Sequence, residues 1–99
     1  MLQELNNMTK NQFKEAYLKF PKNFMTPEII KWEIVGINEN MKLVELSRGL
    51  GIGEEDIYGV SILQECKENK YRLETLSDGK MFTDKKLAEK YYSKLISII

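Results

Sequence analysis

The sequence predicts an α+β domain with a helix near each end of the chain. Three observations lead to this fold class. Both ends carry helix-start signals beside periodic apolar residues, residues 71–76 alternate as a strand does, and an Asp-Gly pair at 78–79 is typical of a hairpin turn. The 99 residues are expected to form a single domain, 1–99, with one modest core.

The first helix is expected to begin after Thr9, because Thr9 and Gln12 have the spacing of a capping box. Pro21 ends it, since its ring cannot continue a helix. The apolar residues between them share one helical face: Phe13, Ala16, Tyr17 and Phe20. Residues 29–35 fit helical spacing and strand alternation alike, and their β-branched content favours a strand.

Residues 41–66 allow two interpretations. As helices they form a helix-turn-helix over 42–63 that turns at Gly51. Its apolar stripe consists of Leu43, Leu46 and Leu50, and Ile57 and Val60 of the second helix face back toward this stripe. As strands, Met41–Arg48 pairs with Ile57–Cys66 across a glycine-rich loop. Each interior glycine costs a helix roughly 1 kcal/mol, which weighs against the helical interpretation.

The C-terminal third is expected to form a hairpin and then a helix. Residues 71–76 alternate, Asp78-Gly79 turns the chain, and Met81-Phe82 returns beside them. Thr83 is expected to cap the last helix. The predicted buried stripe of that helix consists of Leu87, Ala88, Tyr91, Leu95 and Ile98.

Composition argues against most catalytic chemistry. The chain has no histidine and one cysteine, Cys66, so the commonest general base and the Cys/His ligand sets of zinc sites are missing. The acidic run Glu54, Glu55 and Asp56 does not have the spacing of a calcium loop. We therefore expect a protein that is not an enzyme and has no cofactor and no metal. The sequence also lacks a signal peptide and a membrane span, and a cytoplasmic location is expected.

The net charge is zero, so binding to nucleic acid would need a local basic patch. The predicted hairpin at 67–80 offers one. Its candidate DNA-binding residues are Lys67, Asn69, Lys70, Arg72 and Lys80. Lysines can neutralise phosphates, while Asn69 and Arg72 can reach base edges.

The positions Leu46-Ser47, Leu50-Gly51-Ile52, Ile57 and Val60, followed by a basic hairpin at 67–82, resemble winged helix-turn-helix domains over residues 27–82. The resemblance implies a DNA-binding fold. The tip of the second helix would be acidic, at residues 54–56, so contact would move to the hairpin wing. A long helix after the wing is found in dimeric members. Small proteins of this class serve as repressors and as accessory DNA binders of plasmid conjugation and maintenance.

The leading hypothesis from the sequence is thus a small cytoplasmic protein that binds double-stranded DNA through its wing. The resemblance implies a homodimer. The alternative is a four-stranded antiparallel sheet flanked by N- and C-terminal helices. In that version the protein is a protein–protein interaction or inhibitor module.

Overall fold

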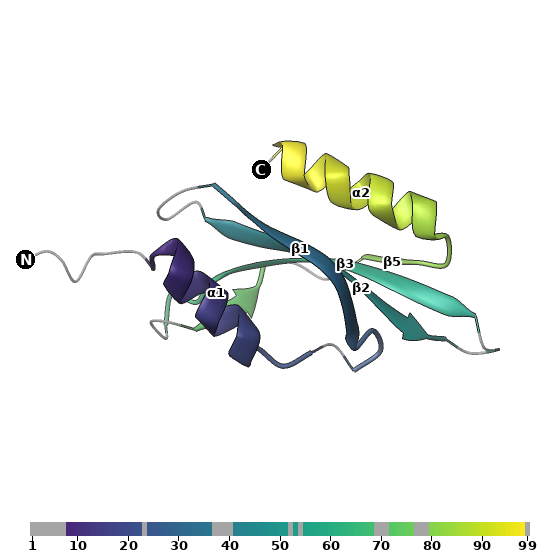
Figure 1. The fold of residues 1–99 in the computed structure, drawn as a ribbon, viewed down its shortest axis with the longest axis horizontal. Coiled ribbons are helices and arrows are strands. Elements are labelled where there is room, and N and C mark those ends of the chain that lie inside the picture. The colour runs from purple at the N-terminus through teal and green to yellow at the C-terminus, as the bar shows by residue number, and fades with distance from the viewer. Residues whose placement is uncertain are drawn as a thin grey trace, which may run out of the picture.

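The computed structural model describes residues 8–22, 24–36, 41–51, 53, 55–68, 72–76 and 80–98. The elements in chain order are α1 (Lys10–Lys19), β1 (Glu28–Val35), β2 (Lys42–Leu50), β3 (Asp56–Glu65), β4 (Leu73–Thr75), β5 (Lys80–Phe82) and α2 (Lys85–Ile98). The strands form an antiparallel sheet, with α1 packed on one face and α2 on the other (Figure 1). The fold is therefore α+β, as the sequence predicts.

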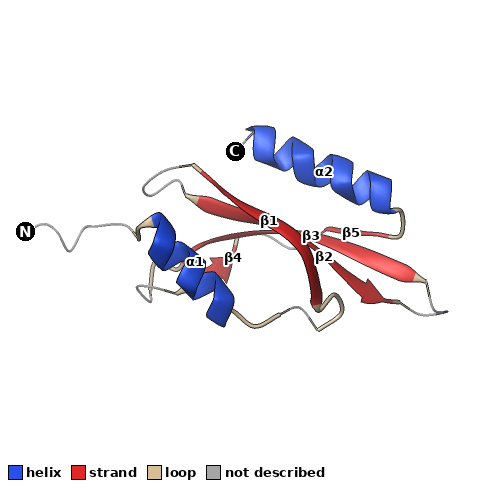
Figure 2. Cartoon of the chain, in the orientation of Figure 1, coloured by secondary structure: helices blue, strands red, loops and turns tan. Residues whose placement is uncertain are grey.

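The sheet has the order β1-β2-β3-β4, and β5 also pairs with β3 (Figure 2). Thr75 of β4 lies opposite Leu63, and Lys80 of β5 lies opposite Val60. The two short strands therefore follow one another along β3 and do not pair with each other. The predicted hairpin between 71–76 and 81–82 is wrong, and its turn residues Asp78-Gly79 lie outside the described residues.

The centre of the chain is a strand hairpin, so the helix-turn-helix interpretation of residues 42–63 is wrong. β2 and β3 pair without interruption from Lys42 opposite Gln64 to Leu50 opposite Asp56. In the connection between them, Gly53 has a φ of 82°, a conformation that costs other residues about 1 kcal/mol or more. The arrangement matches the alternative expectation of an antiparallel sheet between terminal helices.

The core consists of two layers, one on each side of the sheet. The α1 layer contains Phe13, Tyr17, Leu43, Leu63 and Leu73 among its buried residues. The α2 layer contains Val44, Leu46, Tyr58, Val60, Ala88 and Tyr92. Because neighbouring residues of a strand face opposite sides, β2 and β3 both contribute to the two layers.

The sequence predicts the N-terminal cap of α1 correctly and that of α2 incorrectly. The capping box of α1 is confirmed: the Gln12 amide donates to Thr9 Oγ1 at 3.1 Å, and the Thr9 amide donates to Gln12 Oε1 at 2.9 Å. The predicted Thr83 cap of α2 is wrong. The carboxylate of Asp84 accepts from the Lys86 amide at 2.8 Å, because a charged acceptor suits a helix N-terminus.

The predicted buried stripe of α2 is partly wrong. Leu87 and Ile98 are 54% and 66% exposed, while Tyr92 is 4% exposed and fills the centre of the α2 layer. Leu95 and Tyr91 pack at the edge of this layer, as expected. The helix is therefore rotated about its axis relative to the sequence-based stripe.

The segment between α1 and β1 crosses the α1 face of the sheet closely. Thr26 is 1% exposed, and the Ser47 hydroxyl donates to Thr26 Oγ1 at 2.8 Å. A Cβ at Gly49 would lie 1.8 Å from the Met25 carbonyl oxygen, so only glycine permits this approach. This segment, together with α1 and β1, borders a groove on the same face of the sheet.

Candidate functional site

The structure separates the residues predicted to bind DNA. The Cys66 amide donates to the Arg72 carbonyl at 2.8 Å and so brings the two ends of the β3–β4 connection together, with Lys67 beside them. Lys80 instead lies opposite Val60, six positions from Cys66 along β3, or roughly 20 Å at about 3.3 Å per residue. Asn69 and Lys70 lie outside the described residues.

Lys80 has a different local role. Its Nζ lies 5.0 Å from the centroid of the Tyr91 ring, on the face of the sheet that α2 covers. A cation over an aromatic face is attracted by the ring quadrupole, which holds this lysine against α2. The predicted grouping of Lys80 with Lys67 and Arg72 is therefore wrong.

Arg72 instead shares a cleft with the end of α1. Lys19, Cys66 and Arg72 line a cavity of about 290 Å³, which we call the cationic cleft. Among the described residues, no carboxylate forms an ion pair with Lys19, Lys67 or Arg72. The cleft thus offers positive charge that the described part of the chain does not neutralise.

A larger cavity lies between α1 and β1, on the same face of the sheet, and we call it the α1–β1 groove. It encloses about 370 Å³. Its apolar wall includes Tyr17, Leu18, Phe20, Pro21, Ile29 and Trp32. Three charged residues also line it: Lys22, Glu28 and Glu45. A concave, mostly apolar cavity with a few polar groups is the usual form of a binding site.

The polar centre of the groove is the pair Tyr17 and Glu45. The Tyr17 hydroxyl donates to Glu45 Oε2 at 2.6 Å. Burial raises the pKa of Tyr17 well above its ordinary value, and the neighbouring Glu45 carboxylate raises that pKa further. Tyr17 is therefore a neutral donor throughout the physiological range, and the carboxylate supplies the negative charge.

The aromatic wall is formed by residues from two elements. The Tyr17 and Trp32 rings lie 5.2 Å apart between centroids, at an interplanar angle of 52°. Trp32 lies opposite Glu45 in the pairing of β1 with β2, so its indole and the carboxylate occupy one face of the sheet. The ring of Tyr17 reaches them from α1 because the helix packs across this face.

Large apolar side chains are exposed on the groove wall and on the segment that joins α1 to β1. Leu18 is 68% exposed, Met25 is 56% exposed and Phe24 is 96% exposed. Leu18 is part of the groove wall, and Phe24 and Met25 belong to the segment that follows Lys22 and leads to Pro27. The exposed Leu18 extends the apolar wall of the groove, and contiguous exposed apolar surface is typical of surfaces that another molecule covers.

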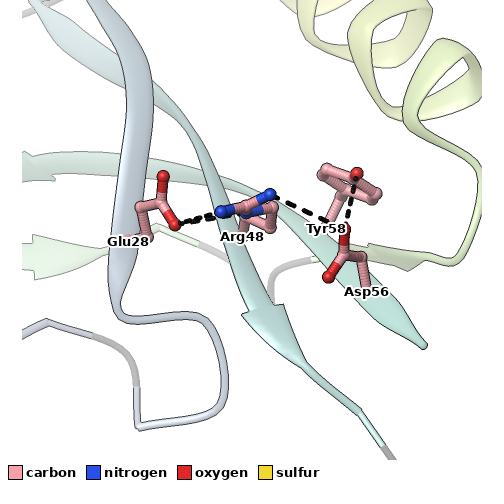
Figure 3. A network of polar contacts seen from close by, with 4 residues as sticks. All are labelled: Glu28, Arg48, Asp56 and Tyr58. Carbon is pink, nitrogen blue, oxygen red and sulfur yellow. Dashed lines mark hydrogen bonds and ion pairs between the residues drawn. The ribbon is translucent and has the colours of Figure 1, made fainter. Parts of the chain in front are cut away.

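An ion-pair network links three strands on the α2 face of the sheet (Figure 3), and its Glu28 also lines the groove. Arg48 of β2 lies between Glu28 of β1 and Asp56 of β3, with N–O distances of 2.7 Å and 3.6 Å respectively. The hydrogen bond from Arg48 to Glu28 raises the pKa of the guanidinium above its ordinary value, and both carboxylates add to this shift. The Tyr58 hydroxyl lies 3.5 Å from Asp56 and contributes a weaker contact. Because these groups are exposed, the network orients Glu28 more than it stabilises the fold.

The described residues include no group of three His, Cys, Asp or Glu side chains arranged to hold a metal ion. None of the described helices is long and apolar enough to span a bilayer. No protein-family model, curated protein or solved structure matches the chain.

Sequence reasoning missed the α1–β1 groove, although two signals for it are present. Glu45 interrupts the most apolar stretch of the centre, Leu43-Val44-Glu45-Leu46, and a carboxylate there needs a partner or an opening to solvent. Trp32 is the single tryptophan of the chain and lies in a segment that already favours a strand. Trp32 and Glu45 lie side by side because β1 pairs with β2, and spacing along the chain does not reveal this pairing.

Proposed function

We propose that this protein is a non-enzymatic protein-binding module and that its α1–β1 groove takes an apolar segment of a partner. The observation that carries the proposal is the groove itself: a concave aromatic wall continuous with the exposed side chain of Leu18. Leaving such a surface in water is unfavourable, at about 25 cal/mol for each Å² of apolar area. Covering it with a partner recovers that free energy.

The edge of the sheet beside the groove is unsuited to pairing with a further β-strand. A partner is therefore expected to bind through side chains in the groove. β1 forms this edge, and its register shifts between Ile29 and Lys31 as at a β-bulge. The Lys31 Nζ lies 5.0 Å from the centroid of the Tyr92 ring, so a charge sits on the face that α2 covers. A bulge and inward-directed charges are features that discourage pairing with a further strand.

Selection from a random peptide library on the immobilised protein tests the proposal. We expect peptides that bind the wild type and the Leu87→Gln variant but not the Leu18→Gln variant, because glutamine removes the apolar surface without adding a charge. Both leucines are exposed helix residues, at 54% for Leu87 and 68% for Leu18, but only Leu18 lines the groove. Peptides that bind all three proteins equally, or the absence of any binding peptide, would contradict the proposal.

A second candidate function, binding to double-stranded DNA, keeps one specific observation in its favour. Lys19 and Arg72 meet in the cationic cleft, and Lys67 adjoins it, with no ion pair to a carboxylate of the described residues. In this version the contact is made by the β3–β4 connection and the end of α1. A repressor or plasmid accessory role, and assembly as a homodimer, belong to this second candidate.

A mobility-shift titration with a short DNA duplex at low salt tests the second candidate. Three neutralised phosphates predict a slope of log K against log salt of about −2.7. Arg72→Ala and Lys67→Ala should each weaken binding, while Lys85→Ala, an exposed residue on α2, should not. Equal affinities for the wild type and the Arg72→Ala variant would exclude this surface as the DNA contact.

A further inference from the structure

We infer that the α1–β1 groove receives the side chain of an arginine or lysine of the partner, which lies against Trp32 and pairs with Glu45. This inference rests on the proposed function, because it assumes that the groove is the binding surface. It adds the chemistry of the partner: a basic residue within an apolar segment. Three features of the described residues support it.

The first feature is the incomplete pairing of the Glu45 carboxylate. Its Oε2 accepts from the Tyr17 hydroxyl, while its Oε1 has no hydrogen-bond or ion-pair partner among the described residues. Glu45 is partly buried on β2, which lies between β1 and β3. A half-paired carboxylate of this kind gains from a charged donor, since charge-assisted hydrogen bonds are about twice as strong as neutral ones.

The second feature is the aromatic wall. The tilted Tyr17 and Trp32 rings lie on the same face as Glu45 and line the same cavity. Among aromatic side chains, indole attracts cations most strongly, and a guanidinium can also stack on its plane. The combination of an aromatic face and a carboxylate is complementary to a cation and unfavourable for an anion.

The third feature is the size and lining of the cavity. About 370 Å³ accommodates a long side chain, and Pro21 and Ile29 supply apolar surface for its methylene groups. Lysine and arginine place their stems on apolar surface in this manner while the charged end reaches a polar group. The neighbouring Leu18, 68% exposed, would then contact the apolar residues that flank the basic one.

The other charged residues of the groove do not change this assignment. Glu28 is already bound to Arg48 at 2.7 Å. Lys22 is exposed, lines the groove, and makes no ion pair with the described carboxylates. It is a like charge for the incoming residue, so replacing Lys22 by alanine should leave the affinity unchanged or raise it.

Two capped tripeptides test the inference: acetyl-Leu-Arg-Leu-amide and its citrulline counterpart, which keeps the shape of the arginine side chain without its charge. Trp32 is the single tryptophan, so its fluorescence reports directly on the groove. We expect the arginine peptide to bind the wild type about ten-fold more tightly, which corresponds to roughly 1.4 kcal/mol. In the Glu45→Gln variant this ratio should fall to about one. In the Glu74→Gln control it should persist, since Glu74 of β4 accepts a hydrogen bond from Gln64 of β3 and does not line the groove.

The outcomes separate this inference from the proposed function. Equal binding of both peptides by the wild type, lost in the Leu18→Gln variant, would overturn the role of the cation and leave the groove as the binding surface. Failure of both peptides to bind would overturn the inference, and the peptide selection would then decide the proposed function. Weaker binding by Lys22→Ala would also overturn it, because the occupant would then be an anion. The comparison of the two peptides uses only the wild-type protein, so it does not depend on whether any variant folds.

Discussion

The hydrogen bond between Tyr17 and Glu45 gives the sharpest prediction about stability. Tyr17→Phe removes the hydroxyl that donates to Glu45 Oε2 at 2.6 Å and leaves the rest of the ring in place. A hydrogen bond to a charged group contributes about 1.5–3 kcal/mol. Because Glu45 borders a groove that water can enter, water can replace part of this bond. We therefore expect a loss of about 1.5 kcal/mol, or roughly 6–12 °C in Tm for a domain of this size.

Urea denaturation followed by circular dichroism at pH 7 measures this loss. Tyr91→Phe is the matched control, since the described residues include no hydrogen-bond partner for the Tyr91 hydroxyl. A double-mutant cycle with Glu45→Gln should give a coupling energy of at least about 0.5 kcal/mol, as expected for residues in contact. If Tyr17→Phe were as stable as Tyr91→Phe, the account of the groove's polar centre would be wrong.

Three further predictions concern the rest of the fold. Gly49→Ala should cost about 1–3 kcal/mol in a urea titration, because its Cβ would overlap the Met25 carbonyl; an unchanged midpoint would refute the close crossing. Leu46→Ala, at a fully buried position of the α2 layer, should cost about 2–5 kcal/mol, and a loss below 1 kcal/mol would contradict two-sided burial of β2. Burial raises the pKa of Tyr92 to about 12 from 10.0, and Glu33 adds to the shift. The unfolded chain therefore loses this proton first, so stability should fall as the pH rises from about 10 through 12; a flat profile of urea midpoints over that range would contradict the burial of Tyr92.

Local signals predict the first helix and the first strand well. The capping box at Thr9 and the stop at Pro21 act within a few residues, so they can be recognised without knowledge of the fold. Strand character over 29–35 is confirmed by β1, Glu28–Val35. These elements are predictable because side chains near each other in sequence determine them.

The centre of the chain misleads for a physical reason. Leu43 and Leu46 are three residues apart, the spacing of neighbours on a helix. In the structure Leu43 faces the α1 layer and Leu46 faces the α2 layer. A strand buried on both faces loses the alternation that normally identifies it, so its apolar residues can imitate a helical stripe. The resemblance to a helix-turn-helix came from this two-sided burial.

The sites depend on contacts between distant segments, which explains why the sequence shows them incompletely. Lys67 and Arg72 were predicted together and meet through the bond between Cys66 and Arg72. Lys19 joins them only because α1 packs over this end of the sheet. The α1–β1 groove likewise combines Tyr17 with Glu45, which lie 28 residues apart in sequence.

The most direct test of the central claim is an amide NMR titration of the full chain with the arginine tripeptide. The account predicts that the indole N–H of Trp32 and the backbone amide of Glu45 shift, while the amides of Lys67 and Arg72 stay in place. Shifts confined to Lys67 and Arg72, with the Trp32 indole unmoved, would contradict it.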